Sequence, residues 1–369
     1  MPYFFHDDPE FWHVAPPSLK HARGLAEIRN MKAAMFVLGE PDDLDAPLAL
    51  FVRMPEGYVS QRHSHDCYRM ELMIEGTHTR ADGTVLKAGD ISTNKPGEEY
   101  GPFVVGKGGS YSLELFSRGA AMVHTNAEKS EAAAAVAKLV EAVNDGTMTA
   151  DEFRSSPELA RWGKEELARD WKGELNASAP CCPPNDAIEI EIEDIDMPYH
   201  FQDDADFWAI APRRLRYATT LAKAQHHRAA LFVLGEEDNL DAPLALVLRM
   251  PEGFVAPRHS HPCHRLEMVL EGTHIREDGT ILGPGDVSTS LPGEEYGPFL
   301  IGKGGSLSIE IFSKQSAMTP ENSDENPTTI ALAKLMAALN SGAITPEQAA
   351  EDPVLQQWGA EAIARKWEQ

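Results

Sequence analysis

Two stretches of the sequence each carry a pair of histidines that stand one residue apart. The first is RHSHDCYRMELMIEGTH at 62–78, where the pair is His63 and His65, and the second is RHSHPCHRLEMVLEGTH at 258–274. Alternate residues of a β-strand lie on one face of it, so two imidazoles at this spacing can bind one metal ion through their ring nitrogens. The sequence therefore predicts a metal site in each stretch.

A carboxylate follows each pair at a spacing that a regular strand would place on the same face. In the first stretch this residue is Glu71, and Arg69 precedes it with the same parity. A bulge near 66–67 is the alternative way to bring the carboxylate beside the histidines. The predicted metal ligands are His63, His65 and Glu71 in the first stretch and His259, His261 and Glu267 in the second.

Both stretches belong to a repeat that runs through the chain. MPYFF at residue 1 matches MPYHF at 197, and the displacement of 196 residues holds without a gap to the end. Gene duplication accounts for such a match and predicts two copies of one fold. The expected units are 1–173 and 197–369, joined by a linker at 174–196.

Each copy changes along its length from strand-like to helix-like sequence. Residues 46–118 hold short apolar runs separated by turns, including the Asp-Gly hairpins ADGT and EDGT, and this favours antiparallel strands. The Gly-rich GKGGS at 106–110 is expected to be a turn. Helices are expected at 15–35 and after Phe116, with Thr149 as an N-cap. Each copy is thus predicted to be a mainly β domain with a C-terminal helical extension.

Two motifs in this strand-rich region resemble those of the cupin superfamily. The stretch from Gly57 to Gly76 resembles the first motif, which is a glycine, five residues, His-x-His and a later glycine. GDISTNKPGEEYGPF at 89–103 resembles the second motif, and both recur in the second copy. The resemblance implies a tandem duplicated cupin: two jelly-roll-like, double-stranded β-helix barrels with a site inside each.

The chain departs from the cupin pattern at the position of the family's glutamate. That position holds Arg69 in the first copy and Arg265 in the second. An arginine inside a barrel is costly unless paired. It either binds a substrate carboxylate through two hydrogen bonds or neutralises the nearby glutamate, and the sequence leaves both readings open. Arg69 and Arg265 are the predicted substrate-binding residues.

The family's third histidine is also replaced, by Tyr100 in the first copy and Tyr296 in the second. These tyrosines, with the repeated His78 and His274, are the predicted acid–base catalysts. The alternatives are a packed tyrosine with a bonded hydroxyl and a hydrogen-bonded strand histidine. The cysteines of the two stretches, Cys67 and Cys263, are expected to be small barrel fillers.

The charge of the chain limits the classes of partner. It has 58 acidic and 33 basic residues and a formal net charge of −25. Such a surface repels phosphates and anionic lipid heads, so neither nucleic acid nor a membrane is an expected partner. The N-terminus does not read as a signal peptide, and four cysteines are too few for a disulfide framework, so a cytoplasmic location is expected. Cys181 and Cys182 are expected to be incidental linker thiols.

Two histidines and one carboxylate form the facial triad that suits non-haem Fe(II). The favoured hypothesis is therefore a metal-dependent bicupin dioxygenase that uses Fe(II) on a small enolisable or phenolic substrate, which can be anionic. One alternative is a non-redox lyase or isomerase of the cupin type that uses Zn, Ni or Mn. The other is a non-catalytic bicupin that binds a small molecule. Pairing into a homodimer is a further open expectation.

Overall fold

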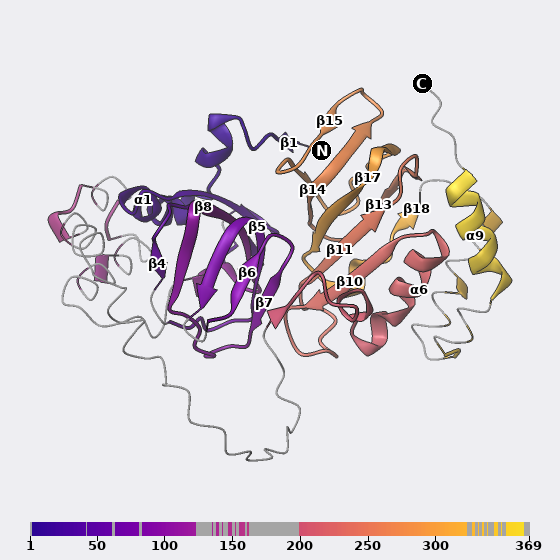
Figure 1. The fold of residues 1–369 in the computed structure, drawn as a ribbon, viewed down its shortest axis with the longest axis horizontal. Helices are drawn as coiled ribbons and strands as arrows, with labels where there is room; N and C mark the ends of the chain where they lie inside the picture. The colour runs from indigo at the N-terminus through magenta and orange to yellow at the C-terminus, as the bar shows by residue number, and fades with distance from the viewer. Residues whose placement is uncertain are drawn as a thin grey trace, which may run out of the picture. The chain divides into compact units, whose positions relative to one another are not determined.

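The computed structural model describes residues 2–41, 43–60, 63–80, 83–122, 199–322 and 352–364, with short pieces between 135 and 161 and between 327 and 348 (Figure 1). The linker at 174–196, with Cys181 and Cys182, lies outside the described residues. None of the helices in the described part of the chain is long and apolar enough to cross a membrane.

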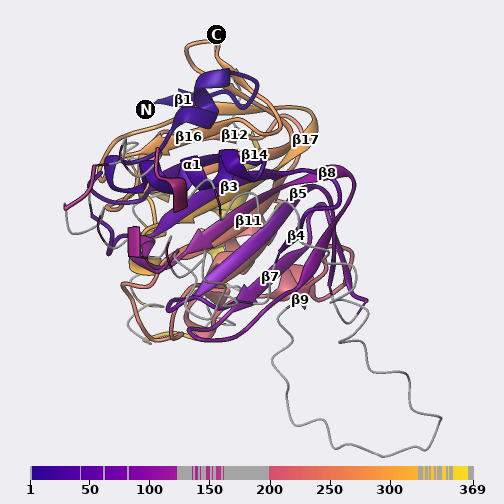
Figure 2. The ribbon, with the colours of Figure 1, turned by 90° about the vertical axis from the view of Figure 1, so that its left-hand side faces the viewer.

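The chain forms two compact units, one built from two separate segments and the other from a single continuous one. One unit combines Met1–Phe11 with Asp203–Gln369, and the other is Trp12–Gln202. In the first of these, β1 (Tyr3–Phe4) pairs with β16 (Val287–Ser290), and in the other β9 (Tyr199–His200) pairs with β7 (Ile91–Asn94) (Figure 2). Each unit therefore takes an edge strand from the segment that leads into the other copy of the repeat. We call the unit that holds His63 the N-terminal unit and the unit that holds His259 the C-terminal unit.

The N-terminal unit is an antiparallel sheet with the strand order β2-β3-β8-β5-β7-β9. Two short strands extend it, since β4 pairs with β8 and β6 pairs with β5. The bounds of the strands in this sheet, apart from β9, are β2 (Lys32–Val37), β3 (Leu48–Met54), β4 (Val59–Ser60), β5 (Arg69–Arg80), β6 (Val85–Lys87), β7 (Ile91–Asn94) and β8 (Phe103–Phe116).

The C-terminal unit repeats this order as β1-β16-β14-β17-β11-β10, with β12 on β17 and β15 on β14. A further pair, β13 with β18, stands apart from the large sheet. The bounds are β10 (Arg228–Val233), β11 (Leu244–Met250), β12 (Val255–Ala256), β13 (His259–Ser260), β14 (Arg265–Arg276), β15 (Ile281–Leu282), β16 (Val287–Ser290), β17 (Phe299–Phe312) and β18 (Glu321–Asn322).

The mainly β, duplicated fold expected from the sequence is confirmed, but strand pairing does not close either sheet. Among the described residues, the end strands of each path, such as β2 and β9, are not paired with one another. The closed barrel that the cupin resemblance implies is therefore replaced by an open sheet in each unit. The Asp-Gly hairpin between β14 and β15 is present, with Gly279 at φ 84°.

One helix packs on each sheet at the predicted position, with α1 (Lys20–Ile28) in the N-terminal unit and α6 (Arg216–Ala224) in the C-terminal unit. α1 is followed by Asn30 at φ 55°, a left-handed residue of the kind that ends helices. The N-terminal core lies between α1 and the first strands, where Leu19, Met35 and Leu48 pack together. The predicted helix within 15–35 is confirmed.

The C-terminal extensions are described only in part. Thr149 and Glu152 form a reciprocal capping box, in which the Glu152 amide donates to Thr149 Oγ1 at 3.2 Å and the Thr149 amide donates to Glu152 Oε2 at 2.8 Å. The predicted N-cap is confirmed. In the C-terminal unit α9 (Pro353–Ala364) is a helix that lies beside α6 (Figure 1).

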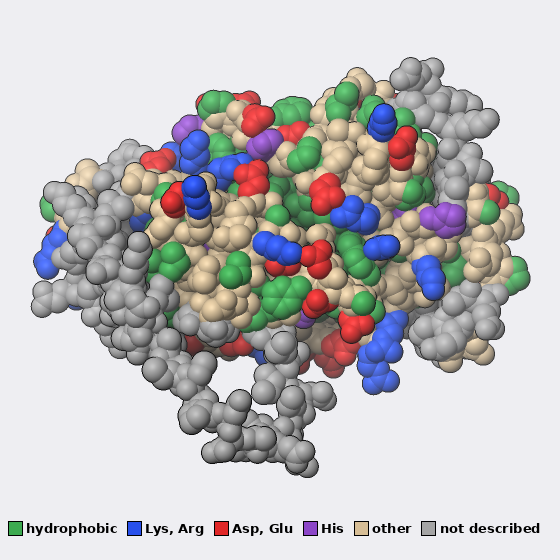
Figure 3. Space-filling view, in the orientation of Figure 1, with side chains coloured by type: hydrophobic (Ala, Val, Ile, Leu, Met, Phe, Trp, Pro, Cys, Tyr) green, Lys and Arg blue, Asp and Glu red, His purple; other side chains and the backbone are tan. Residues whose placement is uncertain are grey.

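The prediction of a turn at GKGGS is wrong, because β8 runs through it without a break. Gly108 and Gly109 have φ near 86° and 84°, and the pairing of β8 with β5 shifts register on this stretch. The shift lets the two strands approach closely: a Cβ on Gly76 would lie 2.1 Å from the Gly109 carbonyl oxygen. The glycines therefore allow a bulge within β8, and the chain does not reverse direction there. Acidic and basic side chains are interspersed on the face that Figure 3 shows.

Candidate metal centre

The histidine pair does not lie on the same strand as Arg69 and Glu71. His63 and Tyr100 form an isolated bridge, with the His63 amide donating to the Tyr100 carbonyl at 3.0 Å and the reverse bond at 2.9 Å. The chain then bends at 66–67, and β5 begins only at Arg69. The expectation that these side chains share one face of a regular strand is therefore wrong, since the backbone between them is not extended.

In the N-terminal unit the two imidazoles converge on one phenol. Nε2 of His63 lies 2.7 Å from Tyr100 Oη, and Nε2 of His65 lies 2.9 Å from it. Nδ1 of His65 bonds to the Ala121 carbonyl at 3.0 Å, and a carbonyl can only accept. In the neutral tautomer that this bond selects, Nε2 of His65 carries a lone pair and accepts the proton of Tyr100. A phenol has one proton, so His63 donates to the same oxygen.

In the C-terminal unit both rings are held through Nδ1. His259 bonds to the Pro257 carbonyl at 2.7 Å and His261 to the Ala317 carbonyl at 3.0 Å. Burial, reinforced by His259, holds the pKa of His261 well below its ordinary value, so this ring is neutral. Nε2 of His261 lies 2.9 Å from Tyr296 Oη. A backbone carbonyl on Nδ1 is the usual way to orient a metal-binding histidine, so these donors fit a divalent metal.

The tyrosine beside each pair keeps its proton. Tyr100 is 9% exposed and Tyr296 is 4% exposed, and burial raises the pKa of each phenol well above its ordinary value. An arginine opposes this, because the guanidinium of Arg69 lies 4.1 Å from the centre of the Tyr100 ring and Arg265 lies 4.1 Å from that of Tyr296. Each site therefore presents two imidazole nitrogens and a protonated phenol.

Glu71 lies in a separate buried ionic cluster. It is paired with Arg80 at 2.7 Å, with His78 at 3.2 Å and with Arg69 at 3.4 Å. Burial raises the pKa of Glu71, but Arg69, His78 and Arg80 together outweigh it and hold the pKa well below its ordinary value. The carboxylate is thus charged and already neutralised by its neighbours. The C-terminal unit repeats this cluster around Glu267.

The predicted triads are therefore not brought together. Among the described residues, no set of three or more His, Cys, Asp or Glu side chains could hold a metal ion. Metal binding by His63 with His65, and by His259 with His261, stays a prediction. Glu71 and Glu267, as the third ligands, are not placed beside them.

Arg69 is hydrogen-bonded to a side chain on each of the two strands that flank β5. Its Nε donates to Glu114 Oε2 at 2.8 Å, and its Nη1 donates to Asn94 Oδ1 at 3.2 Å. It also lines the cavity beside the histidines. Of the two readings that the sequence left open, the contacts favour charge neutralisation, and the binding of a substrate by Arg69 or Arg265 stays a prediction.

His78 and His274 lie in the ionic clusters, among the residues that line neither cavity described below. His78 bonds to Ser110 Oγ at 2.9 Å and stacks on Phe103. These contacts match the alternative stated for His78 in the sequence analysis, a strand histidine held by a hydrogen bond. Cys67 and Cys263 are buried, free thiols within the two hydrophobic cores.

Sequence reasoning missed Glu114 and its counterpart Glu310, which line the two cavities. Glu114 stands directly opposite Glu71 across the β5–β8 pair. Two facing carboxylates repel, and Arg69 between them removes that repulsion. The available signal was a glutamate inside the apolar runs YSLELF and LSIEIF of both copies.

A cavity opens beside each histidine pair. In the N-terminal unit it has a volume of about 110 Å³, and in the C-terminal unit about 230 Å³. The histidines, the tyrosine and the Glu114 position line both. A small molecule in either cavity would thus touch the same polar groups.

No protein-family model matches the chain, and no curated protein does either. Among solved structures, the chain is similar to oxalate decarboxylase from Bacillus subtilis at 16% identity, with 83% of this chain and 78% of that chain covered and a TM-score of 0.44. A second structure of that decarboxylase, reported with a study of its Mn(II) centres, covers 87% of this chain and 82% of that chain at 16% identity and a TM-score of 0.40. An identity of 16% is too low to carry a reaction from those proteins to this chain.

Proposed function

We propose that the protein is a divalent-metal-dependent enzyme of the non-redox type, a lyase or isomerase that acts on a small organic molecule in the cavity beside the histidines. The observation that carries the proposal is the grouping of two imidazoles with a phenol in the lining of each cavity. Both Nε2 atoms contact Tyr100 Oη in the N-terminal unit, and in the C-terminal unit His261 Nε2 contacts Tyr296 Oη while the His259 ring lies 4.3 Å from the tyrosine ring, centre to centre. The metal would be held by His63 with His65, and by His259 with His261. Mn, Zn, Ni and Fe all accept imidazole nitrogen.

When bound, the metal supplies a Lewis acid that polarises an oxygen of the substrate. The phenol supplies the proton. Tyr100 stays protonated at neutral pH because burial raises its pKa, and its hydroxyl points at the nitrogens that would bind the metal. With those nitrogens held by a metal, the hydroxyl would be free to donate to a substrate atom that has gained negative charge. Arg69, over the ring, stabilises the phenolate that remains.

The Fe(II) dioxygenase hypothesis depended on a facial triad that included Glu71. In the structure Glu71 is committed to Arg69, Arg80 and His78, so the residue that singled out Fe(II) is not beside the histidines. A metal held by two histidines serves non-redox chemistry without a carboxylate ligand. We therefore favour the lyase or isomerase alternative.

Elemental analysis of the purified chain, followed by a screen of small carboxylic and carbonyl compounds in anaerobic buffer, tests the proposal. We expect bound divalent metal and turnover without oxygen. Tyr100→Phe and Tyr296→Phe should together lower kcat by about 10²- to 10⁴-fold while metal content stays the same, because a proton donor is lost. Tyr199→Phe, outside both cavities, is the matched control.

Two results would overturn the proposal. One is a purified chain that holds no metal and whose melting temperature does not rise with Mn(II), Fe(II), Zn(II) or Ni(II). The other is turnover that consumes one oxygen molecule per substrate and stops in anaerobic buffer, which would restore the dioxygenase.

A further inference from the structure

The turn that ends helix α6 places a histidine where such a turn commonly carries an apolar residue. The His227 amide donates to the Ala222 carbonyl at 2.7 Å. The His226 amide donates to the Lys223 carbonyl at 3.1 Å, and His226 has φ 60°. These two bonds and the left-handed residue form a Schellman motif, whose last residue frequently packs an apolar side chain on the helix. Helix α1 ends in the same way, and Met31 stands at that position. The turn itself therefore does not explain the histidine.

His227 is buried, and one of its ring nitrogens lacks a partner in the part of the chain that the structure describes. The residue is 8% exposed, and Nε2 has no hydrogen bond there. The ring meets Phe254 edge-on, with ring centres 4.3 Å apart. Burial, with a smaller effect from His226, lowers the pKa of His227 to about 4, so the imidazole is neutral at pH 7. A buried polar atom without a partner is unfavourable unless a ligand or water bonds to it.

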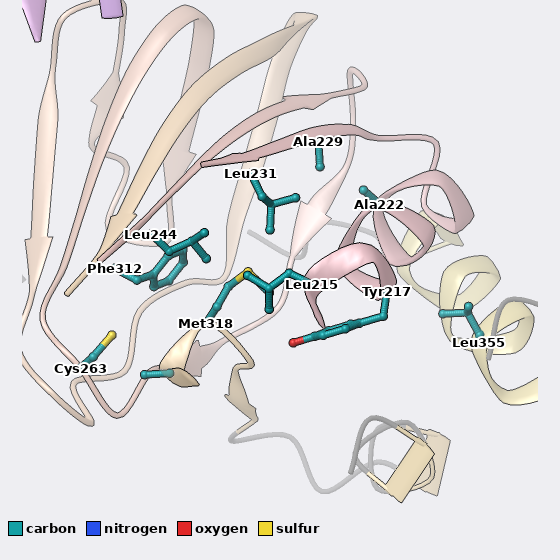
Figure 4. Close-up of a cluster of buried hydrophobic side chains, with 11 residues drawn as sticks. Leu215, Tyr217, Ala222, Ala229, Leu231, Leu244, Cys263, Phe312, Met318 and Leu355 are labelled. Atoms are coloured by element: carbon teal, nitrogen blue, oxygen red, sulfur yellow. The ribbon is translucent and has the colours of Figure 1, made fainter. Parts of the chain in front are cut away.

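His227 lines the cavity of the C-terminal unit, and most of the wall around it is apolar. Figure 4 shows the apolar cluster of this unit, which includes four side chains that also line the cavity: Tyr217, Ala222, Phe312 and Met318. The Tyr217 hydroxyl is already bonded to Thr319 Oγ1 at 3.1 Å. The body of a ligand here would therefore contact apolar side chains over most of its surface.

The charges beside this cavity are balanced. Among the described residues that line it there is no lysine or arginine. The Glu310 carboxylate lines it, and Arg265 donates to Oε2 of Glu310 at 2.8 Å. Gln225, two residues before His227, adds a neutral amide to the wall, where the first copy has Arg29 in the lining of its own cavity. The part of a ligand that lies near His227 would therefore find hydrogen-bonding groups without a net charge.

The volumes of the two cavities limit the size of a ligand. A cavity of roughly 150 Å³ in a protein interior holds one benzene molecule. The C-terminal cavity has a volume of about 230 Å³, and the N-terminal cavity about 110 Å³. The larger cavity thus has room for one six-membered ring with a short substituent, and the smaller one does not.

We propose that the C-terminal site binds an uncharged, one-ring molecule whose hydroxyl group bonds to His227. A neutral imidazole donates through one nitrogen and accepts through the other, and a hydroxyl can bond to either. Another part of the molecule would reach His259, His261 and Tyr296, which line the same cavity. This inference rests on the proposed function, because it names the substrate class of one of the two metal sites, with His227 as the residue that sets specificity.

Two probes of matched shape test the proposal on the full chain: 4-fluorobenzyl alcohol and 1-ethyl-4-fluorobenzene, each titrated by ¹⁹F NMR. They differ by a hydroxyl in place of a methyl group, so the ratio of their affinities reports the hydrogen bond. His227→Met, which installs the residue of the first copy, should lower the affinity for the alcohol relative to the ethyl compound by about 5- to 10-fold. His227→Gln keeps a hydrogen-bonding group and should retain most of the ratio.

Substitutions in the two matched helices show where the probes bind. Ala218 of α6 lines the C-terminal cavity, whereas Ala22, at the matching position of α1, is not among the described residues that line either cavity. Ala218→Phe should weaken both probes by about 10-fold or more, because the added ring takes up the apolar space that they need. Ala22→Phe is the matched control and should leave both titrations unchanged.

The inference is overturned if neither probe shows saturable binding, or if His227→Met leaves the affinity ratio unchanged in protein whose circular dichroism matches the wild type. A change as large in His227→Gln as in His227→Met would also overturn it, because packing and not a hydrogen bond would then set the ratio. Equal weakening by Ala218→Phe and Ala22→Phe would place the probes outside the cavity and contradict it too.

Elemental analysis of the same samples separates this inference from the proposed function. Metal-free protein that shows the expected probe pattern contradicts the proposed function alone. Metal-loaded protein whose affinity ratio does not respond to His227→Met contradicts this inference alone.

Discussion

The N-terminal and C-terminal sites share one half and differ in the other. Around the phenol and the ionic cluster the distances agree closely: the Arg69–Glu114 and Arg265–Glu310 contacts are both 2.8 Å, and the His78–Glu71 and His274–Glu267 contacts are both 3.2 Å. At the helix end, however, a cation faces one cavity and a neutral imidazole the other. Buried charges hold each other in place and resist change, whereas single wall residues can change with little effect on their neighbours.

The largest expected effect is on metal content. His63→Ala with His65→Ala, or His259→Ala with His261→Ala, should each remove one of two metal ions per chain in elemental analysis. In the C-terminal unit both rings are anchored through Nδ1, and such anchors typically change metal affinity by about 10- to 100-fold.

His13→Ala, at an exposed histidine, is the control for these substitutions. Loss of both ions from either double variant would show one shared site and not two.

Because both units contain the same ionic cluster, we expect loss of its central glutamate to destabilise the two units equally. Glu71→Gln and Glu267→Gln each leave buried arginines without their partner, and we expect the free energy of unfolding of the affected unit to fall by about 3–5 kcal/mol. Urea unfolding followed by tryptophan fluorescence measures this. Unequal losses, with one near zero, would show that only one cluster is needed for the fold.

The pH dependence should differ between the units because only the C-terminal one has His227. Its pKa falls from about 6.5 to about 4 on folding, so between these values the unfolded chain binds the extra proton and stability falls as the pH falls. The loss should reach about 3 kcal/mol at pH 4. His227→Met should remove it, and unfolding measured at pH 7 and pH 4.5 checks the difference. An unchanged pH dependence in the variant would contradict the assignment.

The smallest expected effect is a difference in stability cost between substitutions of two half-buried arginines at matched positions, Arg53 and Arg249. Arg53 and Arg249 each pair with a glutamate, at 2.8 and 3.0 Å. Arg53 also lies 4.4 Å from the centre of the Tyr111 ring, and leucine stands at that position in the second copy. Arg53→Ala should therefore cost about 0.5–1 kcal/mol more than Arg249→Ala in the urea experiment. Equal costs would show that the aromatic contact contributes nothing.

Local sequence patterns predicted the local structure well. The helix within 15–35, the Asp-Gly hairpin at Gly279 and the Thr149 cap all form where expected, because each depends on a few neighbouring residues. GKGGS was misread for a related reason. Glycines with positive φ suit both a turn and a bulged strand, and only the partner strand decides between them.

The sequence identified most residues of the site, but it did not predict which of them lie close together. The repeat identified His63, His65, Glu71, Tyr100 and their counterparts as a set. Parity then grouped Glu71 with the histidines, and this failed because the bend at 66–67 interrupts the strand. Glu114 was missed because it comes from β8, remote in sequence, and lies opposite Glu71 only through pairing.

The sequence by itself determined the duplication, the mainly β copies, and which polar residues each copy carries. Those are matters of period, turn chemistry and composition, and they need no knowledge of which strands meet. Only the tertiary structure decided that imidazoles converge on a phenol, that the glutamate joins two arginines, and that one cavity ends in a cation and the other in a neutral histidine. These depend on strand pairing between residues far apart in the chain, which places charges close enough to neutralise one another.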